Sequence, residues 1–177
     1  RRKTTLSNIA RCFPNKTSQE HRTITRQCFH YYSDCLWETI KLSTATAAQM
    51  RKRVTIKNVE LVTTYLQQNR NVLLWGGHCG NIEAFNICGS YFRSAFAYKP
   101  LKHKKFEEWI KQNRSHFNSL IIPSHKIINF YKQQNQTQAH AMFLFSDQRP
   151  SPSARNLATI DFFSIPTTFT KGAFILA

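Results

Sequence analysis

Apolar residues along this chain fall into short runs that alternate with longer segments of helical periodicity. Continuous or alternating apolar runs predict strands at residues 51–56, 72–75, 94–98, 120–122, 140–145 and 158–163. Apolar residues at helical spacing predict helices over 59–68, 82–87, 106–117, 127–136 and from 172 onward, with a long loop over 146–157. Strands that alternate with helices are typical of an α/β domain, so we expect a largely parallel sheet flanked by helices.

Two further helices are predicted in the N-terminal segment. Pro14 ends the first helix, and Thr17 and Glu20 have the spacing of a capping box at the start of the second. Apolar residues then recur at helical period in one stripe, which consists of Ile24, Cys28, Tyr31, Tyr32, Cys35, Leu36 and Ile40. Such a stripe can line a lipid groove, but we expect it to pack in the core against the next layer.

The apolar run at 72–75 is followed by a glycine-rich turn and then by a helix that starts near residue 82. This arrangement places one side chain at a helix N-terminus, near free backbone N–H groups. His78 is therefore the candidate general base, and Glu83 is the candidate carboxylate that orients its ring. Backbone N–H groups around Gly77, Gly80 and Asn81 are the candidate donors to an oxyanion.

Taken alone, the spacing of His78 and Glu83 also fits an ordinary histidine and a glutamate that the helix dipole favours. Asp147 follows the strand at 140–145 as His78 follows the strand at 72–75. In a parallel sheet both residues would lie beyond the carboxyl ends of strands, where ligands bind. We therefore expect Asp147 to gather with His78 at one edge of the sheet.

The charge of the chain indicates an acidic partner. Its 177 residues include 25 basic and 9 acidic side chains, for a net charge of +16. A nucleic acid, an anionic membrane or an acidic protein could each bind a chain with this positive charge. The aromatic residues follow core periodicity and no nucleic-acid-binding motif is visible, so we expect no nucleic acid partner. The His78 and Glu83 pair disfavours a non-catalytic membrane-surface module.

Cysteine usage predicts neither a disulfide frame nor a metal site. The five cysteines are odd in number and lack a C-x-x-C pair, which is typical of reduced thiols in a cytosolic compartment. His and Cys show no metal-ligand spacing, and no metal or other cofactor is expected. Cys79, beside His78, is expected to be a small buried residue that fills space and not a nucleophile. No apolar run approaches the ~18 residues needed to span a bilayer.

Several stretches resemble one enzyme family. WGGHCGNIEAF resembles the G-H-x-G-N-W-E signature of the late lipid A (lauroyl/myristoyl) acyltransferases, a branch of the H-x4-D/E glycerolipid acyltransferases, with Ile82 at the usual Trp. AYKPLKHKKFEEWIKQNRSHF resembles the family's Y-R-P-L block, with Lys99 at the usual Arg and Asn118 at the usual Gly. FLFSDQRP and DFFSIPTTFTKGAFILA resemble its strand with Asp-Gln and its F-F-G-x-P block, the latter with Ser164 at the usual Gly. RKTTLSNIARCFPNKTSQEHRTITRQCF, near the chain start, resembles the family's opening pair of helices. Together these stretches are spread over nearly the whole chain in the family's order.

The resemblance implies a glycerolipid-acyltransferase-like fold that moves a fatty acyl chain from a thioester to a hydroxyl of a lipid A precursor. A lysophospholipid or another lipid amphiphile is the alternative acceptor, and the donor is an acyl carrier protein thioester or acyl-CoA. His78 would be the base and Glu83 its orienter. The substrate-binding candidates are Arg114, Asp147, Lys99 and Arg149.

The resemblance also bears on organisation and location. By length the chain is a single domain, residues 1–177. It starts without Met on a basic cluster and stops within a predicted helix. We therefore expect an incomplete acyltransferase domain, with the family's N-terminal membrane anchor and C-terminal part outside it. The expected location is the cytoplasmic face of the bacterial inner membrane, on an anionic lipid surface.

Overall fold

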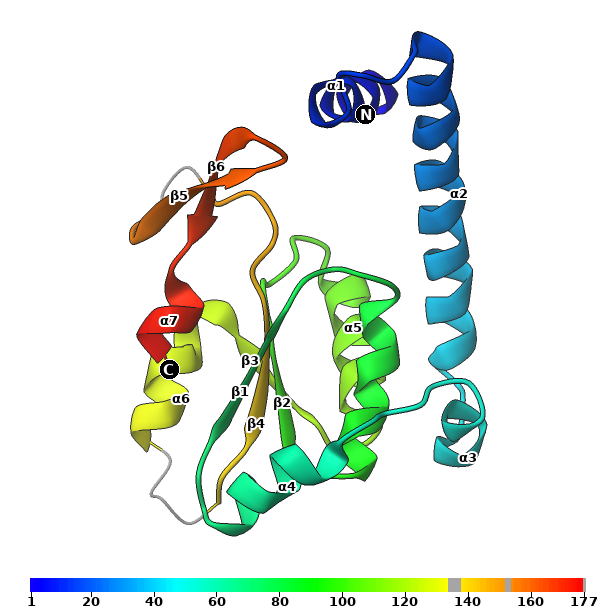
Figure 1. Ribbon diagram of the computed structural model, residues 1–177. Coiled ribbons are helices and arrows are strands. Elements are labelled where there is room, and N and C mark those ends of the chain that lie inside the picture. Colours follow the sequence, from blue (N-terminus) through cyan, green and yellow to red (C-terminus); the bar gives the residue numbers. More distant parts are fainter. Residues whose placement is uncertain (134–137, 152–153, 177) are drawn as a thin grey trace.

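A four-stranded parallel sheet forms the centre of the molecule (Figure 1). The computed structural model describes residues 1–133, 138–151 and 154–176. The strands lie in the order β1-β4-β2-β3, with bounds Val72–Gly76, Ala141–Phe145, Ser94–Tyr98 and Leu120–Pro123. All three strand pairings are parallel. The prediction of an α/β domain with a largely parallel sheet is therefore confirmed.

Helices cover both faces of this sheet. The helices of the described residues, on the sheet and beside it, are α1 Arg2–Cys12, α2 Ser18–Leu42, α3 Ala47–Arg51, α4 Val59–Gln67, the 3-10 helix η1 Ile82–Ser90, α5 Lys104–Ser115, the 3-10 helix η2 Ser124–Lys126, α6 Ile127–Gln133 and α7 Gly172–Leu176. Successive strand residues point to opposite faces. Phe143 of β4 thus packs with Cys88 of η1, whereas Met142 packs with Ile127 of α6 on the other face. The predicted helix end at 134–136 and residues 152–153 of the predicted loop lie outside the described residues.

The N-terminal helices stand beside the sheet (Figure 1). The predicted capping box is present, because Glu20 N donates to Thr17 Oγ1 at 3.3 Å and Thr17 N donates to Glu20 Oε2 at 2.7 Å. The prediction that the α2 stripe packs in the core is wrong, since Tyr32 is 69% exposed and Leu36 is 59% exposed. Among the described residues, α2 packs mainly against α1 and η1, so these four residues of its apolar stripe stay exposed: Tyr31, Tyr32, Leu36 and Ile40.

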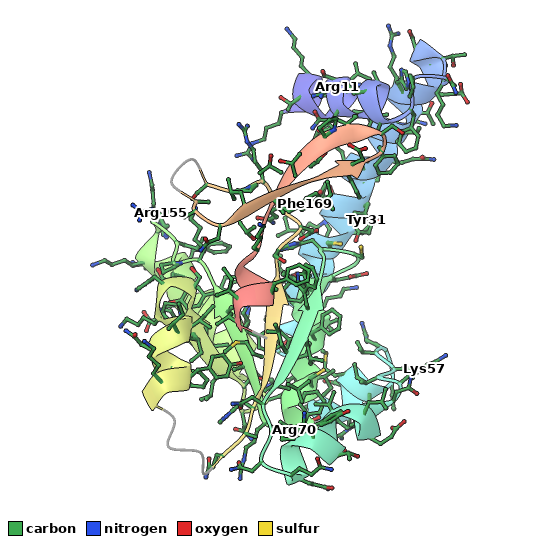
Figure 2. The ribbon with its side chains drawn as sticks, turned by 60° about the vertical axis from the view of Figure 1, so that its left-hand side comes forward. Arg11, Tyr31, Lys57, Arg70, Arg155 and Phe169 are labelled. Atoms are coloured by element: carbon green, nitrogen blue, oxygen red, sulfur yellow. The ribbon has the colours of Figure 1, made fainter. Side chains whose placement is uncertain are left out.

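Two predictions of strands differ from the structure. Residues 51–56 form no strand: Val54 N donates to Met50 O in the turn after α3, and Val54 and Ile56 pack on the cluster around Met50. The last predicted strand is present as β5, Leu157–Phe162, but it pairs antiparallel with an unpredicted β6, Ile165–Thr170. The hairpin adjoins α1 near Arg11 and Phe169 (Figure 2), with the Phe13 and Phe163 rings 5.3 Å apart.

A glycine in η1 allows this helix to approach closely the segment that joins α5 to β3. A Cβ at Gly89 would lie 2.0 Å from Phe117 O and 2.6 Å from Ser119 Oγ. The backbone oxygen cannot move aside as a flexible side chain could. We therefore expect Gly89→Ala to lower the free energy of unfolding by at least the ~1–3 kcal/mol typical of overpacking.

Urea denaturation of the purified protein measures this effect. Gly172→Ala is the matched control, because a Cβ at Gly172 meets nothing within 4 Å. That control should leave the free energy of unfolding close to the wild-type value. Equal midpoints for the two variants would show that η1 can move away from Phe117 at little cost.

Candidate active site

His78 and Asp147 meet at the carboxyl edge of the sheet, where β1 and β4 end side by side. Gly76 and Phe145 are register partners, so the residues two positions beyond each strand leave the sheet together. His78 Nδ1 lies 2.6 Å from Asp147 Oδ1, and His78 N donates to Asp147 Oδ2 at 2.8 Å. A Cβ at Gly77 would lie 3.2 Å from Asp147 Oδ2. The absence of a side chain at Gly77 thus leaves room for the carboxylate against the turn.

The contact with Asp147 determines which nitrogen of the neutral His78 ring carries the proton. Burial acts to raise the pKa of Asp147, but the side-chain and backbone hydrogen bonds from His78 outweigh it and lower this pKa below 3.8. The carboxylate therefore accepts the Nδ1 proton, and Nε2 of the neutral ring keeps a lone pair. The stability that this lowered pKa contributes is present above pH 3.8 and is lost as the pH falls through the folded-state value.

Gln148 is the second partner of the His78 ring. Its Nε2 lies 3.2 Å from His78 Nε2, which places the side-chain amide at the nitrogen that would take a proton. No role for Gln148 was predicted from the sequence. The available signal was its position directly after Asp147, beyond the end of a predicted strand.

The turn between β1 and η1 is held by its own sequence and by α2. Gly80 has φ +87°, a conformation that residues with a Cβ rarely adopt. Asn81 Oδ1 accepts from Glu83 N at 3.0 Å and so caps η1, while Asn81 Nδ2 donates to Cys35 O of α2 at 3.2 Å. These contacts tie the turn that carries His78 to the long N-terminal helix.

Backbone N–H groups of this turn were expected to stabilise an oxyanion. His78 N already donates to Asp147, and Cys79 N donates to Gly77 O at 2.9 Å. These two donors therefore have partners within the protein, and the N–H groups of Gly77, Gly80 and Asn81 stay the predicted donors to an oxyanion. The Cys79 side chain is exposed, so the expectation that it fills buried space is wrong.

Glu83 differs from its expected position, because its carboxylate pairs with Arg114 of α5. Arg114 Nη2 donates to Glu83 Oε1 at 2.6 Å and Arg114 Nε donates to Glu83 Oε2 at 3.0 Å. Both side chains are largely buried. Since η1 begins at Ile82, Glu83 sits in its first turn and points toward α5. The contact with the His78 ring that was predicted for Glu83 is made by Asp147.

A cavity of about 340 Å³ opens beside the His78 ring. Its walls include Lys99, Arg114 and Gln148, together with apolar side chains such as Phe145. The structure thus brings together two of the basic residues predicted to bind substrate. Arg149 is exposed and does not line this cavity. Within the described residues, no cluster of three or more His, Cys, Asp or Glu could hold a metal ion.

Comparison with known proteins identifies one family. The chain matches the family model described as bacterial lipid A biosynthesis acyltransferase over residues 1–177. A search of curated proteins finds no match. None of the described helices combines the length and the apolar character that a bilayer crossing requires.

Proposed function

Because the chain belongs to the bacterial lipid A biosynthesis acyltransferase family, we propose that it moves a fatty acyl chain from a thioester to a hydroxyl of a lipid A precursor, with His78 as general base. The observation that carries this proposal is the Asp147–His78 pair at the edge of a cavity that contains Lys99 and Arg114. A histidine oriented by a carboxylate can take a proton from a hydroxyl near neutral pH.

The proposed reaction is a direct displacement at the thioester carbonyl. The acceptor hydroxyl takes the place of the Gln148 amide at His78 Nε2 and gives its proton to this nitrogen. Its oxygen forms a bond to the carbonyl carbon, and the carbonyl oxygen becomes an oxyanion. As the oxyanion collapses, the C–S bond breaks and the imidazolium returns the proton to the departing thiolate. Asp147 stabilises the imidazolium between these steps.

Donors for the oxyanion and for phosphate lie close to this nitrogen. The side-chain amide of Gln148, once displaced from Nε2, still carries two N–H donors beside the reacting atoms. Lys99 and Arg114 line the same cavity, and cations in such a position can bind a phosphate of the lipid A precursor or of the donor's phosphopantetheine. Arg114 donates two of its five N–H groups to Glu83 through Nε and Nη2 bonds, which fixes its orientation.

The net charge of +16 supports binding of the protein to an anionic surface. We propose that this surface is the cytoplasmic leaflet of the bacterial inner membrane. An acidic acyl carrier protein is a donor that the same charge would attract, and acyl-CoA is the other candidate. A lysophospholipid is the alternative acceptor. It also presents a phosphate and a hydroxyl, so the cavity beside His78 suits it in the same way.

Mass spectrometry of lipid A from cells with and without the full-length gene tests the proposed acceptor. Loss of the gene should remove one acyl chain from lipid A, and the purified protein should acylate a lipid A precursor from an acyl carrier protein thioester or acyl-CoA. Unchanged lipid A, together with faster acylation of a lysophospholipid by the purified protein, would replace lipid A with the alternative acceptor.

A further inference from the structure

A second cavity, of about 430 Å³, lies on the η1 face of the sheet at the edge strand β1. Its walls come from β1, β4, η1 and α4 and include Leu74, Phe143, Phe145, Phe85, Cys88 and Val62. The polar residues Lys57 (labelled in Figure 2) and Asn58 of its lining both directly precede α4. The volume falls within the range of about 300–1,000 Å³ that ligand pockets occupy. Nothing in the reaction proposed above uses this space.

The apolar cavity adjoins the candidate active site through one side chain. Phe145 lines both this cavity and the cavity that contains His78. The Phe145 and His78 rings are 5.4 Å apart between their centroids. A chain that lay in the apolar cavity would therefore end within a few bonds of the nitrogen that takes the proton.

A glycine keeps the end of the cavity near His78 open. Leu74 and Gly76 are alternate residues of β1 and share the cavity face, but only Leu74 carries a side chain there. Gly76 is not among the residues with positive φ, so its backbone conformation is open to other residues. A Cβ at Gly76 would meet only the Phe145 ring, at 3.8 Å. The gap beside Phe145 is therefore a space that an apolar group can enter without displacing the backbone.

Lys57 is the one charged residue among the described residues that line this cavity. Burial raises the pKa of the Cys88 thiol to about 11, so this side chain is a neutral apolar wall at physiological pH. The neighbouring walls are aromatic and aliphatic, and they bury apolar ligand surface without a polar partner for it. Besides Lys57, the side-chain N–H donors of the lining belong to Asn58 and to Trp75, whose indole N–H already donates to Ser146 Oγ. An unbranched hydrocarbon chain fits the aromatic and aliphatic walls.

We infer that this cavity holds the fatty acyl chain of the donor, with its carbonyl end beside Gly76 and Phe145 and its methyl end along Val62 of α4. This inference rests on the proposed function and adds the determinant of acyl length. One methylene more or less in an apolar pocket changes the specificity constant by about 10–200-fold. The far wall of the cavity should therefore set the preferred chain length.

The experiment compares two phenylalanine substitutions on the same helix. Val62 lines the cavity, whereas its neighbour Leu61 is 62% exposed and lies outside the lining. The kcat/KM of the full-length protein is measured with donors of increasing acyl length. Val62→Phe should lower kcat/KM for the preferred donor at least about tenfold and shift the optimum to shorter chains. Leu61→Phe should keep the wild-type profile.

A substitution at the other end of the cavity gives an independent readout. Gly76→Val would fill the gap beside Phe145, so acyl chains should no longer enter while an acetyl donor keeps most of its kcat/KM. Should Val62→Phe fail to fold, Val62→Ala enlarges the same wall and should shift the optimum to longer chains. Wild-type profiles for folded Val62→Phe and for Gly76→Val would overturn the inference.

Binding without turnover separates this inference from the proposed function. A dodecyl thioether analogue of acyl-CoA cannot react, and its affinity should fall about tenfold or more in Val62→Phe but not in Leu61→Phe. If the wild-type protein binds the analogue with this pattern yet acylates no lipid, the proposed function fails and the cavity assignment holds. Equal affinities in both variants, with turnover intact, would overturn the cavity assignment alone.

Discussion

The His78→Ala variant is expected to lower kcat for acyl transfer by about 10²–10⁴-fold while the protein stays folded. His78 is the group that our proposed reaction requires to take the acceptor proton. Its side chain is partly exposed, and its contacts are with Asp147, Gln148 and the Phe145 ring, so its removal should leave the core in place. Steady-state kinetics gives kcat, and a thermal unfolding curve checks the fold.

Asp147→Asn should lose a large part of the same rate, because an amide does not stabilise the imidazolium as a carboxylate does. The double variant should be little slower than His78→Ala, since residues that act as a unit have non-additive effects. Near-normal kcat in folded His78→Ala would remove the histidine from the chemistry. A fully additive double variant would show that Asp147 acts independently of the His78 ring.

The second large effect is expected on stability, from the ion pair between Glu83 and Arg114. Their side chains are only 10% and 17% exposed, and three hydrogen bonds join them. Arg114→Met leaves the carboxylate buried without its partner, which should lower the free energy of unfolding by about 3–5 kcal/mol. Urea denaturation measures this change.

A second ion pair on α5 provides the control for this prediction. Lys111 is 44% exposed and pairs with Glu107 one helical turn away, so Lys111→Met should change the free energy of unfolding far less than Arg114→Met. The double variant Glu83→Gln with Arg114→Met should recover part of the loss, since it leaves no unpaired carboxylate. Similar losses for Arg114→Met and Lys111→Met would show that the buried pair contributes little.

A single Glu83→Gln variant tests whether Glu83 has a structural or a catalytic role. A structural Glu83 predicts that Glu83→Gln lowers stability and leaves the kcat of the folded fraction close to that of wild type. A large fall in kcat without a change in the unfolding midpoint would restore the direct catalytic role that the H-x4-E spacing suggested. We expect the structural role, because the Glu83 carboxylate accepts hydrogen bonds from Arg114.

Features that depend only on residues close together in the sequence could be predicted from it. The strand at 72–75, the capping box of α2 and the strand at 94–98 follow from local apolar pattern and local hydrogen bonding. The hairpin of β5 and β6 was half missed because Phe163 and Ser164 occupy its positive-φ positions, where Asn-Gly is the usual signal. The α2 stripe was misassigned because periodicity shows that a face is apolar but does not show what covers it.

The candidate site needed information that lies outside any local pattern. Placing His78 and Asp147 at one edge followed from parallel strands, but their direct contact depends on β4 being the neighbour of β1. The sequence does not give this order, since β4 is the last of the four strands in the chain. The direction of Glu83 likewise depends on where η1 begins and on the position of α5. A shift of the start of η1 by one residue would point the Glu83 carboxylate in another direction, and so would a shift of α5 by one residue.

The strand order also has a consequence for how activity arises during folding. Among the four strands of the parallel sheet, β4 comes last in the chain and lies between β1 and β2. β1 therefore has no neighbour in this sheet until residues 141–145 pair with it. The hydrogen bond between His78 and Asp147 spans 69 residues of sequence. Non-local parallel pairing of this kind forms slowly. Enzyme activity regained during refolding would therefore report the insertion of β4, whereas helix formation measured by circular dichroism would precede it.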